Sequence, residues 1–373
     1  MDTLQSNRTL EIDILVLMNS VNETTVPPDV STEHMSNYTD FSLQPHTELA
    51  IRIVQVLNSY VIPIVCSLGI IGDVTSFLIF VFTSFRYQPC SQYLASLTFV
   101  DTLFLIANIL SNILYFLPSL GLIPGYCHTM VFFSYVCSFL SAWFIVLMMV
   151  ERYIVVCHPF KVSSICSRKT SIILISTLTS VAVVVYFHTF LTTTYGHHCE
   201  INPNFWEFYV VFTYFDIIIT FTIPFFSILF LNLKIILTVR KFRLRHILIN
   251  KSLYGNKRFF NAERTLSLAQ VHSTKMLVRV SSVFLVLYLP SYALRLYILI
   301  LQKVTDGQIS DLSYVRIHIA QTISQFLYTL NFAVDFIVYV ATSNNFRRHM
   351  YRCLKDFSKI CRQRCAEKKS SFF

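Results

Sequence analysis

The chain of 373 residues is too apolar for two ordinary soluble domains, because 54% of its residues are hydrophobic and only 13% are charged. Its formal net charge of +10 could indicate a nucleic-acid partner, but the charge is distributed unevenly. The first 50 residues hold eight acids and one base, whereas the bases concentrate between and after apolar runs. This asymmetry is typical of a membrane topology, so we expect a lipid bilayer and not nucleic acid around most of the chain.

The N-terminal segment 1–50 is polar and low in apolar periodicity, which predicts a disordered tail. It carries three N-glycosylation sequons, which begin at Asn7, Asn22 and Asn37. Three sequons in fifty residues, all on the acidic side, indicate that this segment is extracellular. A fourth match at Asn250 falls in a basic segment that we place inside the cell, so we interpret it as fortuitous.

Seven apolar runs follow, and each is long enough to cross a bilayer as a helix. They cover residues 57–83, 91–117, 127–157, 170–192, 206–239, 272–300 and 315–341. Segment 240–275 contains nine bases and one acid, and segment 343–373 contains nine bases and two acids. The positive-inside rule places both in the cytoplasm, in agreement with the sequons. We therefore predict an all-α plasma-membrane protein, with a seven-transmembrane helix bundle over 51–342 and a cytoplasmic segment over 343–373.

The cytoplasmic segment is predicted to begin with an interfacial amphipathic helix over residues 345–357. Apolar residues recur there at helical spacing with bases between them, namely Phe346, Met350, Leu354 and Phe357. A disordered basic tail is the alternative. Beside a basic amphipathic helix, cysteines suit S-palmitoylation, and the candidates are Cys353, Cys361 and Cys365.

The predicted topology also separates the ten cysteines. Only Cys127 and Cys199 lie outside the cell, at the start of span three and in the loop 193–205. The others lie within spans or in the cytoplasm, where thiols stay reduced. We expect a disulfide between Cys127 and Cys199 that holds the loop over the mouth of the bundle. Two unpaired exterior thiols are the alternative.

Short motifs occur in order along the predicted spans. They are Gly72-Asp73-Val74, Leu97-Thr98-Phe99-Val100-Asp101, Glu151-Arg152-Tyr153 with Val156-Cys157-His158-Pro159, Pro224, Pro290 and Asp335-Phe336-Ile337-Val338-Tyr339. With the two exterior cysteines, they resemble the motifs of class A (rhodopsin-like) G-protein-coupled receptors over roughly residues 55–357. The resemblance implies a receptor and not an enzyme, which activates a heterotrimeric G protein when an agonist binds and has arrestin as a further partner.

The resemblance also implies how such a receptor switches. Arg152 would pair with Glu151 in the inactive state and contact the G protein once span six moves outward; a plain positive-inside anchor is the alternative. Pro224 and Pro290 each remove a helical hydrogen bond and would act as hinges, unless they are simply tolerated membrane prolines. The other residues assigned to coupling and switching are Tyr153, Phe284, Tyr288 and Tyr339.

Ionisable side chains inside a span indicate function. By resemblance, Asp101 belongs to a buried sodium site, with Ser141, Asn331 and Asp335 as its other polar members. A polar network without sodium is the alternative, and no other cofactor is expected. Asp73 adds a third carboxylate, and carboxylates so close cannot all ionise, so at least one should be protonated or share the sodium ion.

Several positions depart from the family pattern, among them Asp73, which stands where the first helix usually has asparagine. Asp335 and Phe336 replace the asparagine and proline of helix seven, Tyr288 stands where helix six usually has tryptophan, and Asn232 where helix five often has tyrosine. These departures predict unusual activation mechanics.

The ligand pocket is expected between the outer halves of spans three, five, six and seven. Ser134 stands where small-amine receptors carry aspartate, and span seven has no lysine for retinal, so neither ligand is expected. Asp216 could bind a cationic ligand group and Arg295 an anionic or carbonyl group, while an Asp216–Arg295 pair within the bundle is an equal alternative. Tyr292 and Gln325 complete the candidate pocket.

Two stretches favour a peptide as the ligand. Residues 69–77 and 91–105 are similar to the FMRFamide-receptor group, which implies a neuropeptide. A polytopic transporter or channel is the main alternative function. It would favour internal repeats and broken helices, whereas the chain shows no repeat, and a carboxylate cluster above a terminal Glu-Arg-Tyr suits a switch better.

Overall fold

The computed structural model describes residues 52–355, apart from 84–88, 118, 121–122, 196–198, 253–258, 306–310 and 354. Six of its helices are long and apolar enough to cross a membrane, namely Arg52–Phe82, Cys90–Leu114, Tyr126–Cys157, Arg168–Thr192, Pro203–Lys241 and Thr274–Leu301. A bent pair, Arg316–Ala333 with Asp335–Thr342, supplies a seventh when both halves form one span. The predicted seven-helix membrane bundle is therefore confirmed.

The elements follow one another along the chain as η1 (Leu57–Val61), α4 (Ile62–Phe82), α5 (Pro89–Phe116), α6 (Tyr126–Cys157), η4 (Pro159–Lys161), α7 (Val162–Ile165), α8 (Arg168–Tyr186), α9 (Thr189–Thr192), β1 (Thr193–Tyr195), β2 (Cys199–Ile201), η5 (Pro203–Phe205), α10 (Trp206–Asp216), η6 (Ile217–Thr222), α11 (Ile223–Ser252), α12 (Phe259–Thr305), α13 (Asp311–Ala333) and α14 (Asp335–Thr342). The sequons at Asn7, Asn22 and Asn37, and Cys361 and Cys365, lie outside the described residues.

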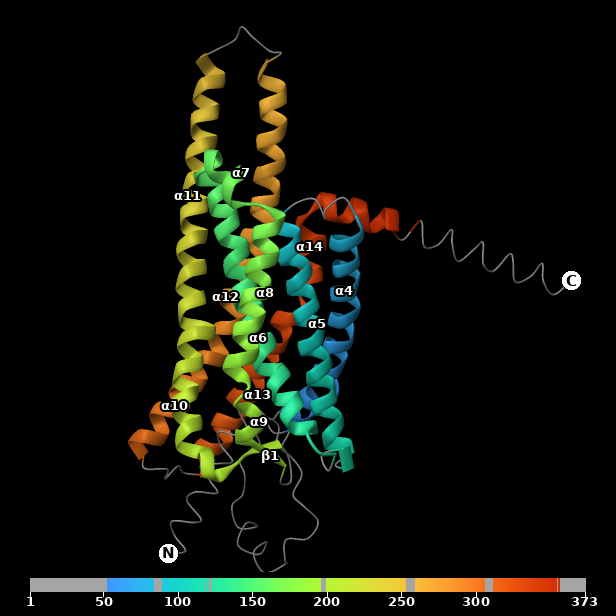
Figure 1. Ribbon diagram of the computed structural model, residues 1–373, viewed down its shortest axis with the longest axis vertical. Helices are drawn as coiled ribbons and strands as arrows, with labels where there is room; N and C mark the ends of the chain where they lie inside the picture. The colour runs from blue at the N-terminus through green and yellow to red at the C-terminus, as the bar shows by residue number, and fades with distance from the viewer. Residues whose placement is uncertain are drawn as a thin grey trace, which may run out of the picture.

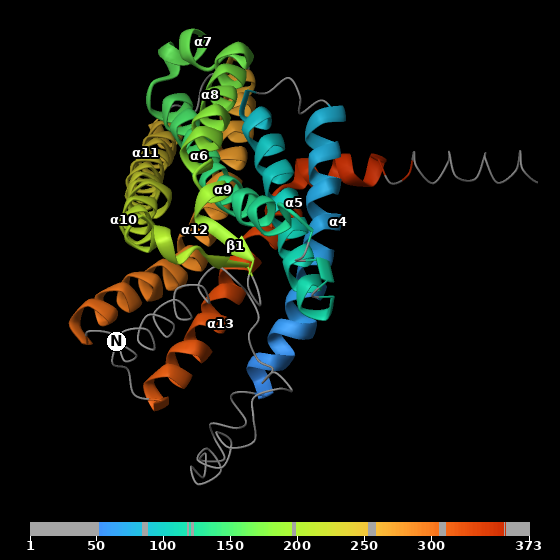
Figure 2. The ribbon, with the colours of Figure 1, turned by 60° about the horizontal axis from the view of Figure 1, so that its bottom comes forward.

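The long helices run side by side along one axis, and α11 and α12 extend past the others at one end (Figure 1). The hairpin β1–β2 lies at the opposite end, which Figure 2 brings forward. We call this the disulfide end, because it holds Cys127 and Cys199. The other is called the Arg152 end, because α6 finishes there, five residues after Arg152.

The bundle is apolar on its outside, and its interior holds polar side chains among a larger apolar core. Leu68, Ile71 and Val286 are each exposed by about two thirds of their surface. In water such a surface would be unfavourable, whereas lipid tails are as apolar as these side chains. Hydroxyl, amide and carboxyl side chains instead lie buried between the helices, where they can find partners.

Helix α4 approaches the seventh span closely through two glycines. A Cβ added at Gly69 would lie 2.7 Å from both Ala333 Cβ and Leu105 Cδ1, and one at Gly72 would lie 2.7 Å from Phe336 Cβ. Small residues at a helix interface allow backbones to pack closely where the hydrophobic effect cannot drive association. The two glycines thus bring Asp73 beside the seventh span.

The seventh span is broken, although the sequence predicts one continuous run over 315–341. Its halves α13 and α14 meet at Val334 with a bend of 52°. Phe336 stands where the family has proline, so the bend forms without the usual cause of a helix kink. Ala333 and Phe336, which flank the bend, are the residues that face Gly69 and Gly72.

Helix five contains a π-helical turn just before Pro224. The turn η6 separates α10 from α11, and Trp143 of α6 donates its indole N–H to the carbonyl of Ile219 within it, at 3.1 Å. A proline has no N–H for the carbonyl four residues earlier, and a π turn rearranges such bonds locally. The kink predicted at Pro224 is therefore a π turn, while Pro290 lies inside the continuous helix α12.

Replacement of Trp143 by phenylalanine is expected to lower the stability of the receptor by about 1 kcal/mol, since a net hydrogen bond is worth about that much. The aromatic packing on Phe139 is kept, and only the donor to Ile219 is lost. Thermal unfolding of the purified protein measures the change. Trp206→Phe is the control, because the Trp206 indole makes no hydrogen bond in the described part of the chain, and equal losses in the two variants would contradict the assignment.

The predicted interfacial helix is present over residues 344–353 and runs across the end of the bundle (Figure 1). Phe346, the first of the recurring apolar residues of this helix, is fully buried against Phe80 and Tyr339, with ring centroids 5.7 and 5.6 Å away. The apolar side of the helix therefore packs on the bundle where the helix begins. Cys353 at its far end is exposed.

Candidate functional site

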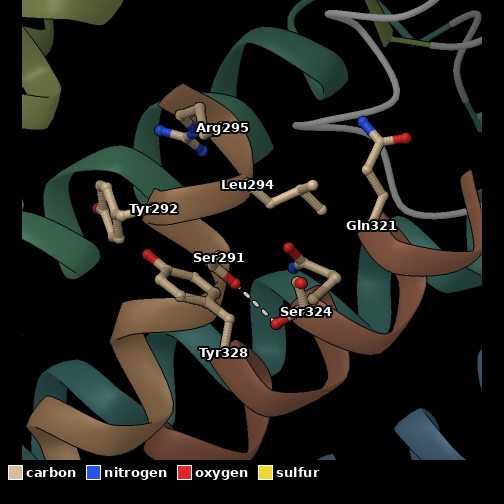
Figure 3. Close-up of a pocket in the computed structure, with 8 residues that line it drawn as sticks. Ser291, Tyr292, Leu294, Arg295, Gln321, Ser324 and Tyr328 are labelled. Carbon is tan, nitrogen blue, oxygen red and sulfur yellow. Dashed lines mark hydrogen bonds between the residues drawn. The ribbon is translucent and has the colours of Figure 1, made fainter. Parts of the chain in front are cut away.

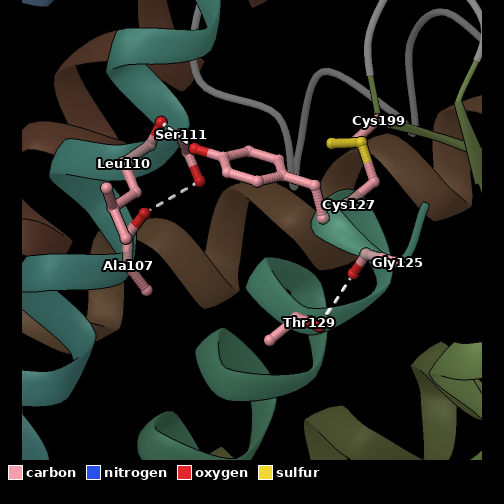
Figure 4. The surroundings of a disulfide bond; sticks show 8 residues. Ala107, Leu110, Ser111, Gly125, Cys127, Thr129 and Cys199 are labelled. Carbon is pink, nitrogen blue, oxygen red and sulfur yellow. Dashed lines mark hydrogen bonds between the residues drawn. A yellow bond between two sulfur atoms is a disulfide. The ribbon is translucent and has the colours of Figure 1, made fainter. Parts of the chain in front are cut away.

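The disulfide end is organised by the predicted bridge, which is confirmed between Cys127 at the start of α6 and Cys199 in β2 (Figure 4). The strands pair antiparallel, with Thr193 opposite Ile201. Gly125 caps α6 with a φ of 82°, a left-handed conformation that suits glycine. The sequence predicts a loop over 193–205. The structure shows a β-hairpin in this segment, linked to the third span by the disulfide.

A pocket opens between α12 and α13 near the disulfide end (Figure 3). It is lined by Ser291, Tyr292, Leu294, Arg295, Gln321, Ser324, Gln325 and Tyr328. The Ser291 hydroxyl donates to the Ser324 carbonyl at 2.7 Å, which ties the two helices together below the pocket. The Tyr328 hydroxyl donates to Ser138 of α6 at 2.6 Å. These two hydrogen bonds connect the pocket residues of α12 and α13 with each other and with α6.

Asp216 and Arg295 form an ion pair with each other inside the bundle. Of the two possibilities left open by the sequence, ligand binding by Asp216 or an internal pair, the structure shows the internal pair. Arg295 Nη1 lies 3.3 Å from Asp216 Oδ2. The other carboxylate oxygen accepts from the Tyr186 hydroxyl at 2.6 Å and from Thr220 at 2.8 Å. Arg295 also lies over the Tyr292 ring, 5.3 Å from its centroid, a cation–π arrangement. This cluster joins helices four, five and six.

Three of the five predicted pocket residues line the pocket, and these are Tyr292, Arg295 and Gln325. Asp216 is 2% exposed and lies behind Arg295. Ser134 is not among the lining residues, and its hydroxyl donates to the carbonyl of Met130 within α6. Sequence reasoning missed Tyr186, which is fully buried in span four. A tyrosine within an apolar span was the available signal, because a buried hydroxyl needs a partner.

The polar core lies deeper in the bundle. Asp73, Asp101 and Asp335 are exposed by 0%, 1% and 6% respectively, so the predicted burial of three carboxylates is observed. Tyr339 donates to Asp335 at 3.3 Å. Several buried oxygens have no hydrogen-bond partner in the described chain: both of Asp73, Oδ1 of Asp101, and the hydroxyls of Ser76 and Ser141. Buried oxygens without partners are costly and suit a small hard cation or ordered water.

The three carboxylates do not form one multi-carboxylate metal centre. Among the residues that the structure describes, no group of three His, Cys, Asp or Glu side chains could hold a metal ion. Asp101 of α5, Ser141 of α6 and Asn331 of α13 are all buried. Oδ1 of Asp101 and Oγ of Ser141 are buried oxygens without a hydrogen-bond partner in the described part of the chain, and they are the atoms that could accept a monovalent cation.

The Arg152 end shows the predicted ion pair. The Arg152 guanidinium lies 3.8 Å from Glu151, and both residues are buried. Tyr153 lies at the same end and contacts the ring of His158 edge-on. Nearby, Ser281 of α12 donates to Asn232 of α11 at 2.9 Å. Asn232, one of the departures from the family pattern, thus connects helices five and six.

An aromatic path connects the pocket with the core. The ring centroids of Tyr328, in the pocket, and Tyr288 are 4.9 Å apart, and those of Tyr288 and Phe284, one turn earlier in α12, are 4.1 Å apart. Phe332 stacks on Phe104 at 3.8 Å on the neighbouring helices. Tight packing of this kind transmits a displacement of one ring to the next. Tyr288 and Phe284, assigned to the switch from the sequence, lie in this path.

Comparisons with known proteins agree with this arrangement. The model of the family "7 transmembrane receptor (rhodopsin family)" matches residues 74–339. The thyrotropin-releasing hormone receptor of Mus musculus is 29% identical over 163 residues, which cover 42% of this chain and 41% of that receptor. The same receptor of Gallus gallus is 30% identical over 138 residues, or 36% of this chain and 35% of that receptor. The FMRFamide receptor of Drosophila melanogaster is 26% identical over 319 residues, or 77% of this chain and 52% of that receptor. The chain thus spans about half or less of the length of these relatives.

Proposed function

This chain belongs to the rhodopsin family of seven-transmembrane receptors, and on that premise we propose that it is a plasma-membrane receptor that binds a peptide and activates a heterotrimeric G protein. One observation carries the proposal. A pocket at the disulfide end is joined by the packed rings of Tyr328, Tyr288 and Phe284 to helix α12. A ligand in the pocket can therefore act on helix α12, which runs from the disulfide end to the Arg152 end of the bundle (Figure 1).

The peptide and the orientation follow from separate observations. The relatives are receptors named for peptides, thyrotropin-releasing hormone and FMRFamide. The disulfide, the sequons at Asn7, Asn22 and Asn37 and the basic segments support an extracellular disulfide end. Cys353 is exposed at the end of the helix over 344–353, which supports palmitoylation there and at Cys361 and Cys365. Arrestin would share the cytoplasmic face with the G protein.

The geometry indicates how the signal would pass. In the described state, Glu151 holds Arg152, and the Ser281–Asn232 bond holds α12 against α11. Displacement of Tyr288 by a ligand that presses on Tyr328 would move α12. Once α12 separates from α11, Arg152 becomes accessible to an entering segment of the G protein. Ligand binding then needs only to favour the separated state over the described one.

Agonist-driven nucleotide exchange tests the proposal. Cells that express the chain are screened against a library of neuropeptides, with calcium and cyclic-nucleotide readouts, and active peptides are then tested on purified receptor with purified G proteins. We expect at least one peptide to accelerate exchange, and Arg152→Ala to abolish the acceleration while peptide binding is retained. Silence toward every peptide together with solute flux into liposomes would favour a transporter instead.

Removal of the Ser281 hydroxyl is expected to raise basal signalling. A net hydrogen bond of about 1 kcal/mol shifts the ratio of the two states about fivefold. Ser281→Ala should therefore increase agonist-free nucleotide exchange by up to that factor, and Asn232→Ala should do the same. The control is Ser282→Ala, because the exposed Ser282 hydroxyl bonds only the carbonyl of Val278 in its own helix. An equal rise in the control would show that the Asn232 contact is irrelevant.

A sodium ion is proposed at Asp101 and Ser141, with Asn331 and Asp335 as the other polar members that the family resemblance implies. The partnerless buried oxygens support this assignment. A ligand that binds only the folded state stabilises it by RT ln(1 + [L]/Kd), or about 1.4 kcal/mol at ten times Kd. Replacing KCl by NaCl at constant ionic strength should therefore raise the melting temperature of the receptor. Asp101→Asn should remove the difference between the two salts, and a shift that persists in this variant would exclude the site.

A further inference from the structure

Two polar contacts of different strength hold α12 against span five, one on each side of Pro290. The inner half of α12, residues 274–289, carries the Ser281–Asn232 bond, and the outer half, residues 291–301, carries the Asp216–Arg295 pair. We propose that this pair is an anchor that stays closed while the receptor switches, so that the outer half keeps its place and the inner half moves. The inference rests on the proposed receptor function and makes Asp216 and Arg295 positioning residues of the switch.

The carboxylate of the anchor belongs to a rigid support. Asp216 is 2% exposed and accepts hydrogen bonds from Tyr186 of span four at 2.6 Å and from Thr220 at 2.8 Å. Thr220 lies in the π turn η6, to which Trp143 of span three also donates a hydrogen bond. The contact from Arg295 therefore attaches span six to a group that spans three, four and five hold together.

The outer half of α12 is attached to two other spans. Arg295 Nη1 lies 3.3 Å from Asp216 Oδ2, and the guanidinium also lies over the Tyr292 ring of its own helix, 5.3 Å from the centroid. The Ser291 hydroxyl donates to the Ser324 carbonyl of α13 at 2.7 Å (Figure 3). An ion pair to span five and a hydrogen bond to span seven thus oppose displacement of this half.

The inner half of α12 is attached more weakly. Its contact with span five is the hydrogen bond from Ser281 to Asn232, at 2.9 Å. Separating one partner from a buried ion pair costs about three to five times as much free energy as a net hydrogen bond contributes. A displacement of α12 away from span five therefore breaks the Ser281 bond and leaves the ion pair closed.

The two halves can move separately because Pro290 lies between them. Proline has no N–H to donate to the carbonyl of Val286, so the helix is easiest to bend at this point. If the ion pair opened during the switch, it would instead be a latch that keeps the receptor inactive. An anchor and a latch predict opposite behaviour of the outer half, which a local probe can measure.

Two fluorine probes follow the two halves on the full-length receptor in lipid nanodiscs. A fluorinated phenylalanine replaces either Val286 or Tyr297, which are 69% and 54% exposed and lie on opposite sides of Pro290. Ser281→Ala supplies the displacement, because the loss of one net hydrogen bond shifts the ratio of two states about fivefold. We expect fluorine NMR to show this change of populations at position 286 and none at position 297. Ser282→Ala is the control and should change neither probe, because the Ser282 hydroxyl bonds only its own helix.

Removal of the ion pair then tests the anchor itself. The double variant Asp216→Asn with Arg295→Gln removes both charges, a change that buried pairs often tolerate. In this background, Ser281→Ala should change the populations at both probe positions. Arg295→Lys keeps a positive nitrogen beside Asp216, so position 297 should again show no response. Thermal unfolding confirms that each variant is folded.

Three results would overturn the anchor. A response at position 297 while the ion pair is intact would mean that the pair opens with the switch. Silence at position 297 after removal of both charges would mean that the pair does not hold the outer half. Silence at both positions in Ser281→Ala would mean that neither half of α12 moves when the bond to Asn232 is lost.

The probe measurements need neither a ligand nor a G protein. A receptor that shows the expected probe responses but never drives nucleotide exchange would refute the proposed function and leave the anchor intact. Peptide-driven exchange by a receptor whose position 297 responds with the pair intact would do the reverse. The two proposals therefore fail separately.

Discussion

Asp216→Ala is expected to destabilise the receptor by about 3–5 kcal/mol, because it leaves Arg295 without a counter-ion inside the bundle. Tyr186 and Thr220 also lose the acceptor to which their hydroxyls donate at 2.6 and 2.8 Å. A loss of this size is a large fraction of the stability of a typical protein. Thermal unfolding of the purified receptor and its abundance at the cell surface should both fall strongly.

Two companion variants separate the charge from the hydrogen bonds. Asp216→Asn keeps an acceptor for Tyr186 and removes only the charge. The double variant Asp216→Asn with Arg295→Gln removes both charges and should recover most of the stability, since neutral replacements of a buried pair are often tolerated. If the double variant is as unstable as Asp216→Ala, the Asp216–Arg295 contact is not the origin of the loss.

The spans were predictable because hydrophobic length and charge asymmetry are properties of the sequence itself. A run of about 20 apolar residues has few alternatives to a membrane helix. The same signals could not predict the bend at Val334 or the π turn η6. Both lie where other helices make contact, Gly69 and Gly72 in one case and the Trp143 indole in the other, and such contacts cannot be seen in the sequence.

The sequence identified the ionisable residues of the site but not which of them form ion pairs and hydrogen bonds with one another. The rarity of ionisable side chains in apolar spans identified Asp73, Asp101, Asp216 and Asp335, and all four are buried. The partner of Asp216 remained open, because helical rotation determines whether Arg295 faces the carboxylate or the ligand. Tyr186 was not predicted for the same reason. Its hydroxyl donates to Asp216, and this contact exists only because span four packs beside span five.

The contact between the first and seventh spans gives the last prediction. Gly69→Ala should destabilise the receptor by about 1–3 kcal/mol, the usual cost of overpacking a filled interface. The new Cβ would lie 2.7 Å from Ala333 Cβ and 2.9 Å from Ala333 Cα, so backbone and not only a flexible side chain must move. Thermal unfolding measures the loss, and Leu68→Ala on the lipid-facing side of the same helix is the control.

The compensating change is Ala333→Gly. It removes the Ala333 methyl group, which the methyl group added by Gly69→Ala would meet. Gly69→Ala with Ala333→Gly should recover part of the stability, because the contact with Ala333 Cα remains. Ala333 ends α13 just before the bend that leads to Asp335, so Gly69→Ala alone should also disturb the bond from Tyr339 to Asp335. An additive double variant would mean that the two residues do not share one interface. Recovery of both stability and agonist response would show that this glycine sets the position of the seventh span and, with it, the polar core.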